Sequence, residues 1–320
     1  MTHTSIQEGS TVSRGRIATR ASLAIGVATP SIVSPHILSA AWGLNNANAC
    51  PKGEKGLDNI PVTFNWFINP TTIQVTDFVI TRTDGTTVTP TCALQFPPNE
   101  PNEIQTVNLI GNFGDPDGVR PNTVTVVGEL EGRPPRASNW RPITPGLRQT
   151  IVQIEAGPDI SDAWRLTPAM LKDDKNACTV GRTFVRVVWS NGMTAYPGGT
   201  EVGDAAVTSY RALFTLPNGK IINVRPLAVA DLADHSTTAM DDNMHDLCLP
   251  KVPARAVLNE IRTGGNFLQD PNGDPNLVQR FKTPNPPPWG FLASDLILTS
   301  SHISRMPFTG ARELVTANPR

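Results

Sequence analysis

An acidic segment, residues 231–246, is the densest group of side chains that could carry out chemistry. Its titratable residues are Asp231, Asp234, His235, Asp241, Asp242, His245 and Asp246. Carboxylates alone would suit calcium, whereas a set that includes imidazoles would suit zinc or manganese. Asp241, Asp242 and His245 are therefore the candidate metal ligands. Their spacing matches no established ligand motif, and a solvated loop is the alternative interpretation.

A second candidate metal site is the segment Asp-Pro-Asn-Gly-Asp-Pro-Asn at residues 270–276. Asp270, Asn272 and Asp274 place side-chain oxygens at alternate positions, as calcium-binding loops do. The segment departs from the EF-hand pattern, because glycine falls at its fourth position and Phe281 stands where a bidentate glutamate is needed. Ordinary turn chemistry is the alternative, since Asp, Asn, Pro and Gly are the preferred turn residues.

Motifs for nucleophilic catalysis are missing from the sequence, which contains no G-x-S-x-G, H-E-x-x-H or P-loop pattern. Ser301 and His302 are adjacent, but adjacency in sequence does not produce the geometry of a catalytic triad. Two carboxylates far apart in the chain could still hydrolyse a glycosidic bond. We identify no catalytic residue, and the pattern favours a protein that is not an enzyme.

Several tryptophans could line a surface that binds sugars or peptides. Trp66 and Trp189 lie inside strand-like runs and are expected in a core, where large aromatic side chains dominate. Trp140 and Trp289 lie in Pro-rich segments and are the better surface candidates. An unidentified protein or a carbohydrate is the expected kind of ligand.

The chain has four cysteines, Cys50, Cys92, Cys178 and Cys248, and none forms a C-x-x-C pair. A zinc knuckle or a thioredoxin-like redox site is therefore disfavoured. An even number of cysteines in an exported protein predicts disulfides, and their order along the chain favours Cys50–Cys92 and Cys178–Cys248. Each bridge would restrict the unfolded chain by about 4 kcal/mol. Four free thiols in a reducing compartment are the alternative.

Residues 1–49 have the order of a secretory signal peptide, with arginines, an apolar stretch and a small-x-small motif. We expect cleavage after Ala49, with Ala41 as the second choice, and a secreted or periplasmic protein. Pro30 and Pro35 disfavour a transmembrane anchor in this stretch. A lipoprotein signal with Cys50 as the lipidated residue is disfavoured, because Ala47 stands where a leucine is typical. A transit peptide is a further alternative. No later segment has the 18 or so consecutive apolar residues of a membrane span.

The formal net charge is −1, and no run of basic residues occurs along the chain. The electrostatic footprint of a nucleic-acid-binding protein is therefore missing from the sequence. Charged residues make up 17%, below the roughly 25% of an average soluble protein. With 30 Pro and 25 Gly, this composition is typical of short strands joined by many turns.

Strand-like runs with turn signals between them cover most of residues 60–224, and Asp84-Gly85 is a hairpin signal. Asn191-Gly192 is expected to form a second hairpin turn, and Ser161 to cap a short helix over residues 161–172. Residues 227–233 are expected to be helical. The sequence thus predicts a mainly β fold: one or two immunoglobulin-like antiparallel β-sandwich modules, short helices and a long irregular C-terminal segment.

The expected organisation has five parts. They are a signal peptide (1–49), a β-sandwich-like domain (50–132), a Pro-rich linker or strap (133–146), a second β-rich domain (147–250) and an irregular tail packed on it (251–320). The expected function is that of an exported, non-enzymatic binding or structural protein, with calcium as the candidate structural ion. An extracytoplasmic metal-dependent hydrolase that uses residues 231–246 is the alternative.

Overall fold

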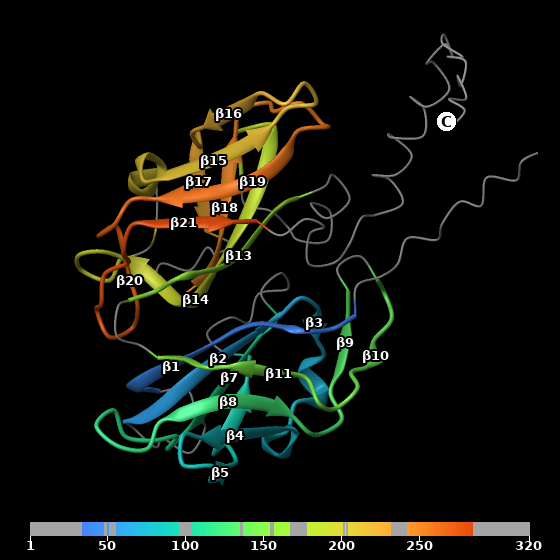
Figure 1. Cartoon of the computed structure of the whole chain (residues 1–320), viewed down its shortest axis with the longest axis vertical. Helices are drawn as coiled ribbons and strands as arrows, with labels where there is room; N and C mark the ends of the chain where they lie inside the picture. The colour runs from blue at the N-terminus through green and yellow to red at the C-terminus, as the bar shows by residue number, and fades with distance from the viewer. Residues whose placement is uncertain are drawn as a thin grey trace, which may run out of the picture.

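The computed structural model describes residues 34–47, 50, 56–95, 104–134, 137–153, 157–166, 178–200, 202, 204–231 and 242–283. These residues form strands β1–β21 and three short 3-10 turns, with no α-helix among them. The protein is mainly β, as expected. Its strands are grouped in two lobes, which lie one above the other in Figure 1. We call residues 34–153 lobe 1 and residues 157–283 lobe 2.

Lobe 1 contains two larger antiparallel sheets and one small one. The first has the order β12 (Val152–Gln153), β1 (Ile37–Ala47), β2 (Leu57–Phe64), β7 (Thr106–Gly111) and β6 (Cys92–Leu94). The second has the order β11 (Arg148–Thr150), β8 (Pro121–Val126), β4 (Phe78–Arg82) and β5 (Thr87–Val88). The small sheet consists of β10 (Arg141–Pro142), β9 (Glu131–Arg133) and β3 (Phe67–Ile68). Among the described strands of this lobe, only the pairing of β12 with β1 is parallel.

The two larger sheets of lobe 1 enclose one hydrophobic core. Ile60, Val62 and Phe64 alternate along β2 and point into it, because successive side chains of a strand face opposite sides of a sheet. Ile80 and Val124 reach the same core from the second sheet. The Asp84-Gly85 hairpin signal is confirmed, since it connects the paired strands β4 and β5.

Lobe 2 contains two sheets of its own. The first has the order β13 (Ile160–Arg165), β14 (Thr183–Ala195), β18 (Asp242–Leu249) and β17 (Ala228–Asp231), and β20 (Leu268–Gln269) pairs with the far end of β14. The second has the order β16 (Ile221–Val224), β15 (Tyr210–Thr215), β19 (Val257–Thr263) and β21 (Gln279–Lys282). Val187, Leu247, Phe214 and Ile261 come from both sheets and share one core.

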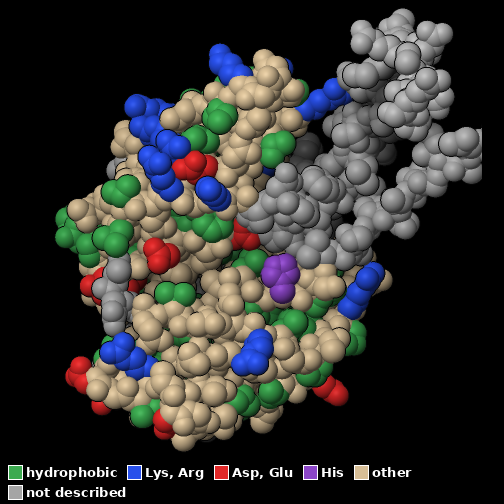
Figure 2. Space-filling model, in the orientation of Figure 1, with side chains coloured by type: hydrophobic (Ala, Val, Ile, Leu, Met, Phe, Trp, Pro, Cys, Tyr) green, Lys and Arg blue, Asp and Glu red, His purple; other side chains and the backbone are tan. Residues whose placement is uncertain are grey.

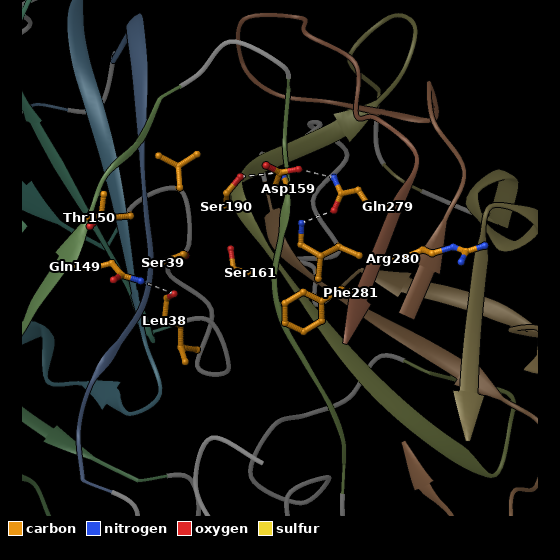
Figure 3. Close-up of a pocket in the computed structure, with 13 residues that line it drawn as sticks. Leu38, Ser39, Gln149, Thr150, Asp159, Ser161, Ser190, Gln279, Arg280 and Phe281 are labelled. Carbon is orange, nitrogen blue, oxygen red and sulfur yellow. Dashed lines mark hydrogen bonds between the residues drawn. The ribbon is translucent and has the colours of Figure 1, made fainter. Parts of the chain in front are cut away.

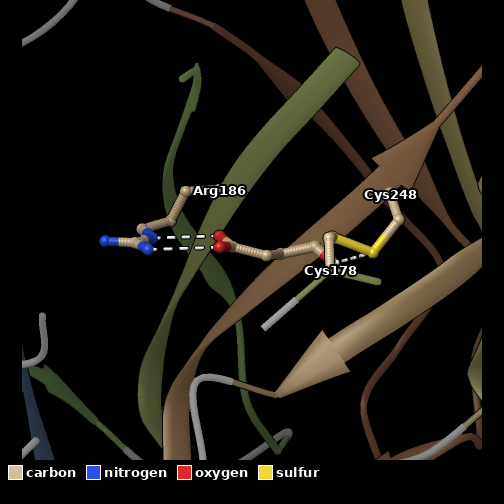
Figure 4. The surroundings of a disulfide bond; sticks show 4 residues. Cys178, Arg186 and Cys248 are labelled. Carbon is tan, nitrogen blue, oxygen red and sulfur yellow. Dashed lines mark hydrogen bonds and ion pairs between the residues drawn. A yellow bond between two sulfur atoms is a disulfide. The ribbon is translucent and has the colours of Figure 1, made fainter. Parts of the chain in front are cut away.

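Both expected disulfides are present, Cys50–Cys92 in lobe 1 and Cys178–Cys248 in lobe 2. Beside the second bridge, the guanidinium of Arg186 donates two hydrogen bonds to the carboxylate of Asp246 (Figure 4). Arg186 and Asp246 are 1% and 0% exposed, so neither charge is left in solvent. A buried pair of this kind is retained only with well-aligned hydrogen bonds, because both ions lose their hydration.

The lobes differ from the expected domain boundaries. Residues 37–47, expected in the signal peptide, form β1, which lies between β12 and β2 and buries Ala40 and Trp42. Ile143, expected in a linker, is part of the lobe 1 core. Residues 251–283, expected in an irregular tail, supply β19–β21 to lobe 2. In each case strand pairing or core packing with other segments, which local sequence patterns do not report, determines the boundary.

Three local expectations are wrong. Residues 161–165 are part of strand β13, whereas residues 167–172 of the expected helix lie outside the described residues. Asn191-Gly192 lies within the continuous strand β14, at an irregularity in its pairing with β18. Ala228–Asp231 is strand β17. Strand pairing overrides weak local preferences at all three places.

Candidate functional site

A cleft of about 430 Å³ lies between the two lobes (Figure 3). One wall comes from β1, β11 and β12 of lobe 1, and the other from β13, β14 and β21 of lobe 2. Ligand sites occur preferentially at such interfaces between domains, where a few polar groups converge among apolar ones. This cleft is the candidate functional site.

The wall from lobe 1 carries a hydroxyl group with no partner. Ser39 lines the cleft and is 6% exposed, and its Oγ has no hydrogen-bond partner among the described residues. Gln149 is held beside it, because its Nε2 donates a hydrogen bond to the carbonyl of Leu38 at 3.0 Å. Buried polar groups rarely lack a hydrogen-bond partner, so a ligand or an ordered water is expected to bind this hydroxyl.

The wall from lobe 2 is a network of side chains that bind one another and the backbone (Figure 3). The Nε2 of Gln279 donates to Oδ1 of Asp159 at 2.9 Å, and its Oε1 accepts from the amide of Ile160. The Oγ of Ser190 accepts from the amide of Asp159 at 3.0 Å. These contacts fix the polar groups at the rim of the cleft before any ligand arrives.

The first residue of lobe 2, Gly157, packs closely against another loop of the lobe. Gly157 has φ +74°, and a Cβ at this position would lie 2.3 Å from the carbonyl oxygen of Pro275. Only glycine lets the chain pass this close to the loop before β21 in a left-handed conformation. The chain therefore enters β13 directly beside the cleft.

A polar junction holds the lobes together next to the cleft. Ser39, Thr63 and Thr106 lie side by side on β1, β2 and β7, on the face turned toward lobe 2. Asn243 of β18 donates from Nδ2 to Oγ1 of Thr106 at 2.9 Å and to Oγ1 of Thr63 at 3.2 Å. Leu38 packs beside this junction against a small cluster from lobe 2. The junction occupies two of the three hydroxyls and leaves that of Ser39 for the cleft.

Most of the residues that line the cleft are uncharged. Asp159 and Arg280 are its charged lining residues, and burial raises the pKa of the Asp159 carboxyl. Arg280 extends away from the cleft (Figure 3). Hydroxyl and amide groups beside Val152 and Phe281 suit a small polar ligand without net charge.

A second cavity, of about 640 Å³, lies within lobe 1. Its buried carboxylate is already used, since Oδ2 of Asp58 accepts hydrogen bonds from Nε1 of Trp42 and the amide of Phe113. Arg82 donates to the carbonyls of Phe113 and Asn112. We therefore prefer the cleft between the lobes, whose Ser39 hydroxyl is unused.

His245, a candidate metal ligand, lies in the core of lobe 2 and is 0% exposed. Its Nδ1 is 2.8 Å from the hydroxyl of Tyr210, which also accepts from Nε1 of Trp189. Burial lowers the pKa of His245 from 6.5 to about 4. The imidazole is therefore neutral at physiological pH and packs as a core side chain.

The remaining residues of the acidic segment do not converge on His245 in the part of the chain described. Asp234, His235 and Asp241 lie outside the described residues. Asp246 points away from His245 and pairs with Arg186. Asp242 is the first residue of β18, and the structure describes only its backbone.

The candidate calcium loop forms a turn held by its first carboxylate. The Oδ1 of Asp270 accepts from the amides of Asn272 and Asp274, each at 3.0 Å. Asp270 is buried, which raises its pKa, whereas the side chains of Asn272 and Asp274 are exposed. Within the described residues, no three His, Cys, Asp or Glu side chains are grouped to hold a metal ion. The geometry matches the turn alternative, and calcium binding stays a hypothesis.

Two expectations about tryptophans are confirmed, because Trp66 and Trp189 are buried. Trp140 is half-buried under the guanidinium of Arg133, and Trp289 lies outside the described residues. The residues of the cleft had no sequence signal, because they come from separate segments of both lobes. Ser39 even lies within the expected signal peptide.

No helix in the described ranges is long and apolar enough to cross a membrane. Comparisons with protein-family models, with curated proteins and with solved structures found no match to this chain.

Proposed function

We propose that this protein is an exported, non-enzymatic binding protein whose ligand occupies the cleft between its two β lobes. The proposal rests on one observation: the buried hydroxyl of Ser39 lines the cleft and has no hydrogen-bond partner in the part of the chain that is described. Ligand binding would supply that partner. The hydroxyl- and amide-rich lining, with Phe281 and Val152 as apolar contacts, favours a carbohydrate unit over a charged metabolite.

Two disulfides support export, because such bonds persist mainly in oxidising compartments. A leader that ended at Ala41 or Ala49 would remove part or all of β1, which lies inside a lobe 1 sheet. We therefore place the end of a leader before Ile37. Sequencing the amino terminus of the secreted protein tests this, and a mature chain that starts at residue 42 or 50 would contradict it.

Two further features belong to the same proposal. The first is that each lobe is an immunoglobulin-like sandwich. The support for it is that two sheets enclose one hydrophobic core in each lobe. A structural calcium ion at Asp270, Asn272 and Asp274 is supported by the oxygen-rich loop alone. No contact among the described residues favours the metal-dependent hydrolase.

The variant Ser39→Ala tests the cleft. We expect the free energy of unfolding to be unchanged or higher, since this hydroxyl makes no hydrogen bond within the described ranges. Titration calorimetry with a panel of neutral mono- and disaccharides should show binding that this variant weakens about fivefold, as expected for one hydrogen bond of about 1 kcal/mol. Thr87→Ala, an exposed hydroxyl in β5, is the control. Equal affinities for both variants, or binding of peptides only, would contradict the proposal.

A further inference from the structure

Lobe 2 carries a row of arginines on the outer face of its second sheet. Arg211 of β15, Arg262 of β19 and Arg280 of β21 are direct cross-strand neighbours in the pairing registers. Arg225 follows β16 by one residue and extends the row, because the register Ala212↔Val224 places it beside Arg211. Neighbouring strands are about 4.8 Å apart, so the row places four arginines in a line. The Nη1 atom of Arg211 also donates hydrogen bonds to the carbonyls of Thr208 and Tyr210.

The next position along the sheet adds a lysine and one carboxylate. Lys282 is the cross-strand neighbour of Glu260, and Glu260 forms a partly exposed ion pair with Arg262 at 2.7 Å. Arg262, Arg280 and Lys282 all contribute to lowering the pKa of Glu260. Burial and, to a smaller extent, Arg225 lower the pKa of Arg211. Five cations against one carboxylate give the row and its neighbours a net charge of +4. Figure 2 shows Lys and Arg side chains gathered around acidic atoms on this lobe.

This concentration of charge opposes folding, because like charges directly opposite each other destabilise a sheet. The net charge of +4 on this face also contrasts with that of the whole chain, which is −1. Arg225, Arg280 and Lys282 are exposed, and Arg211 and Arg262 are half-buried, so the row is accessible to a large partner. A regular line of cations on a flat sheet face suits an extended polymer with regularly spaced negative charges. Guanidinium groups bind carboxylate and sulfate-like oxyanions through two parallel hydrogen bonds.

We propose that this face, Arg225–Arg211–Arg262–Arg280 with Lys282, binds an acidic polysaccharide. A single-stranded nucleic acid is the less suitable polyanion, because its binding surfaces interleave aromatic side chains with the cations. The described strands place their aromatic residues Tyr210, Phe214 and Phe281 on the opposite, core-facing side. The choice of a polysaccharide rests on the proposed export, whereas the anion site itself does not depend on it or on the cleft.

Polygalacturonate and dextran sulfate are the probes, and neutral dextran is the control ligand. We expect the full chain to bind both acidic polymers, with affinity that falls steeply as NaCl rises, and not to bind dextran. The variant Arg225→Gln/Arg280→Gln/Lys282→Gln should weaken binding at least tenfold and reduce the slope of log K against log[NaCl] by about two to three, on the scale known for phosphate contacts. Its melting temperature should equal or exceed that of the wild type, because like-charge repulsion is removed.

The matched control is Arg141→Gln/Arg148→Gln/Lys251→Gln, which removes three exposed cations elsewhere. It should keep the affinity and the salt slope of the wild type. Equal loss in both triple variants would overturn the proposal, since the attraction would then depend on net charge alone. Tighter binding to single-stranded DNA or to phosphatidylserine vesicles than to both polymers at the same salt would also overturn it. Ser39→Ala should bind the acidic polymers normally, which separates this face from the cleft.

Discussion

Asp162 is a buried acid on the edge strand β13, and it makes the stability of lobe 2 depend on pH. Its side chain is 3% exposed, and burial raises the pKa of its carboxyl from 3.8 to about 7. The Oδ1 atom accepts a hydrogen bond from the amide of Ala163 at 2.7 Å, which only partly offsets the effect of burial. We expect Asp162→Asn to stabilise the protein, because asparagine keeps this acceptor and cannot ionise.

The sign follows from the two pKa values. Below pH 3.8 the carboxyl is protonated in both the folded and the unfolded chain, so it contributes no pH dependence. As the pH rises toward 7, the unfolded chain ionises while the folded one does not, and the free energy of unfolding falls. Three pKa units correspond to about 4 kcal/mol. Asp162→Asn should therefore raise stability by about 4 kcal/mol at pH 7.5 relative to its effect near pH 4.

Urea unfolding followed by circular dichroism, from pH 4 to pH 8 with the disulfides intact, measures this difference. Asp117→Asn, an exposed substitution in lobe 1, controls for the change in net charge. A benefit that does not grow with pH would refute the reasoning. Destabilisation at pH 7.5 would do so as well, because it would mean that an ionised carboxylate is stabilised at this position.

Two further outcomes can be measured in the same way. His245 has the opposite effect on the pH dependence of stability, because burial lowers its pKa to about 4. The neutral imidazole contributes about 3 kcal/mol to the free energy of unfolding above pH 6.5, and this contribution is lost as the pH falls to 4. His245→Asn should therefore change stability by an offset that shrinks on acidification, and an offset independent of pH would contradict this. Replacing Cys178 and Cys248 together by alanine should lower the free energy of unfolding by about 4 kcal/mol, since the bridge closes a loop of 70 residues; a change below about 1 kcal/mol would show that the bridge adds little to folding.

Local patterns were sufficient for the features that depend on nearby residues. The strand-like run that begins at residue 60 predicted a strand, and Asp84-Gly85 predicted a hairpin, because both signals act within a few residues. The order of the cysteines also led to the correct pairing, since each bridge closes within one lobe. The same patterns failed at β13 and at Asn191-Gly192, where pairing with β14 and β18 decided the outcome.

The sequence by itself determined the β class of this protein and its two disulfides, because composition, alternation and the order of the cysteines can be seen without knowing which segments pair. The tertiary structure alone decided which side chains meet. Ser39 and Gln279 line one cleft although they are far apart in sequence. Arg211, Arg262 and Arg280 form one row although the sequence contains no basic run. The physical reason is that strand register, set by burial of one face and by long-range pairing, chooses the neighbours of each residue.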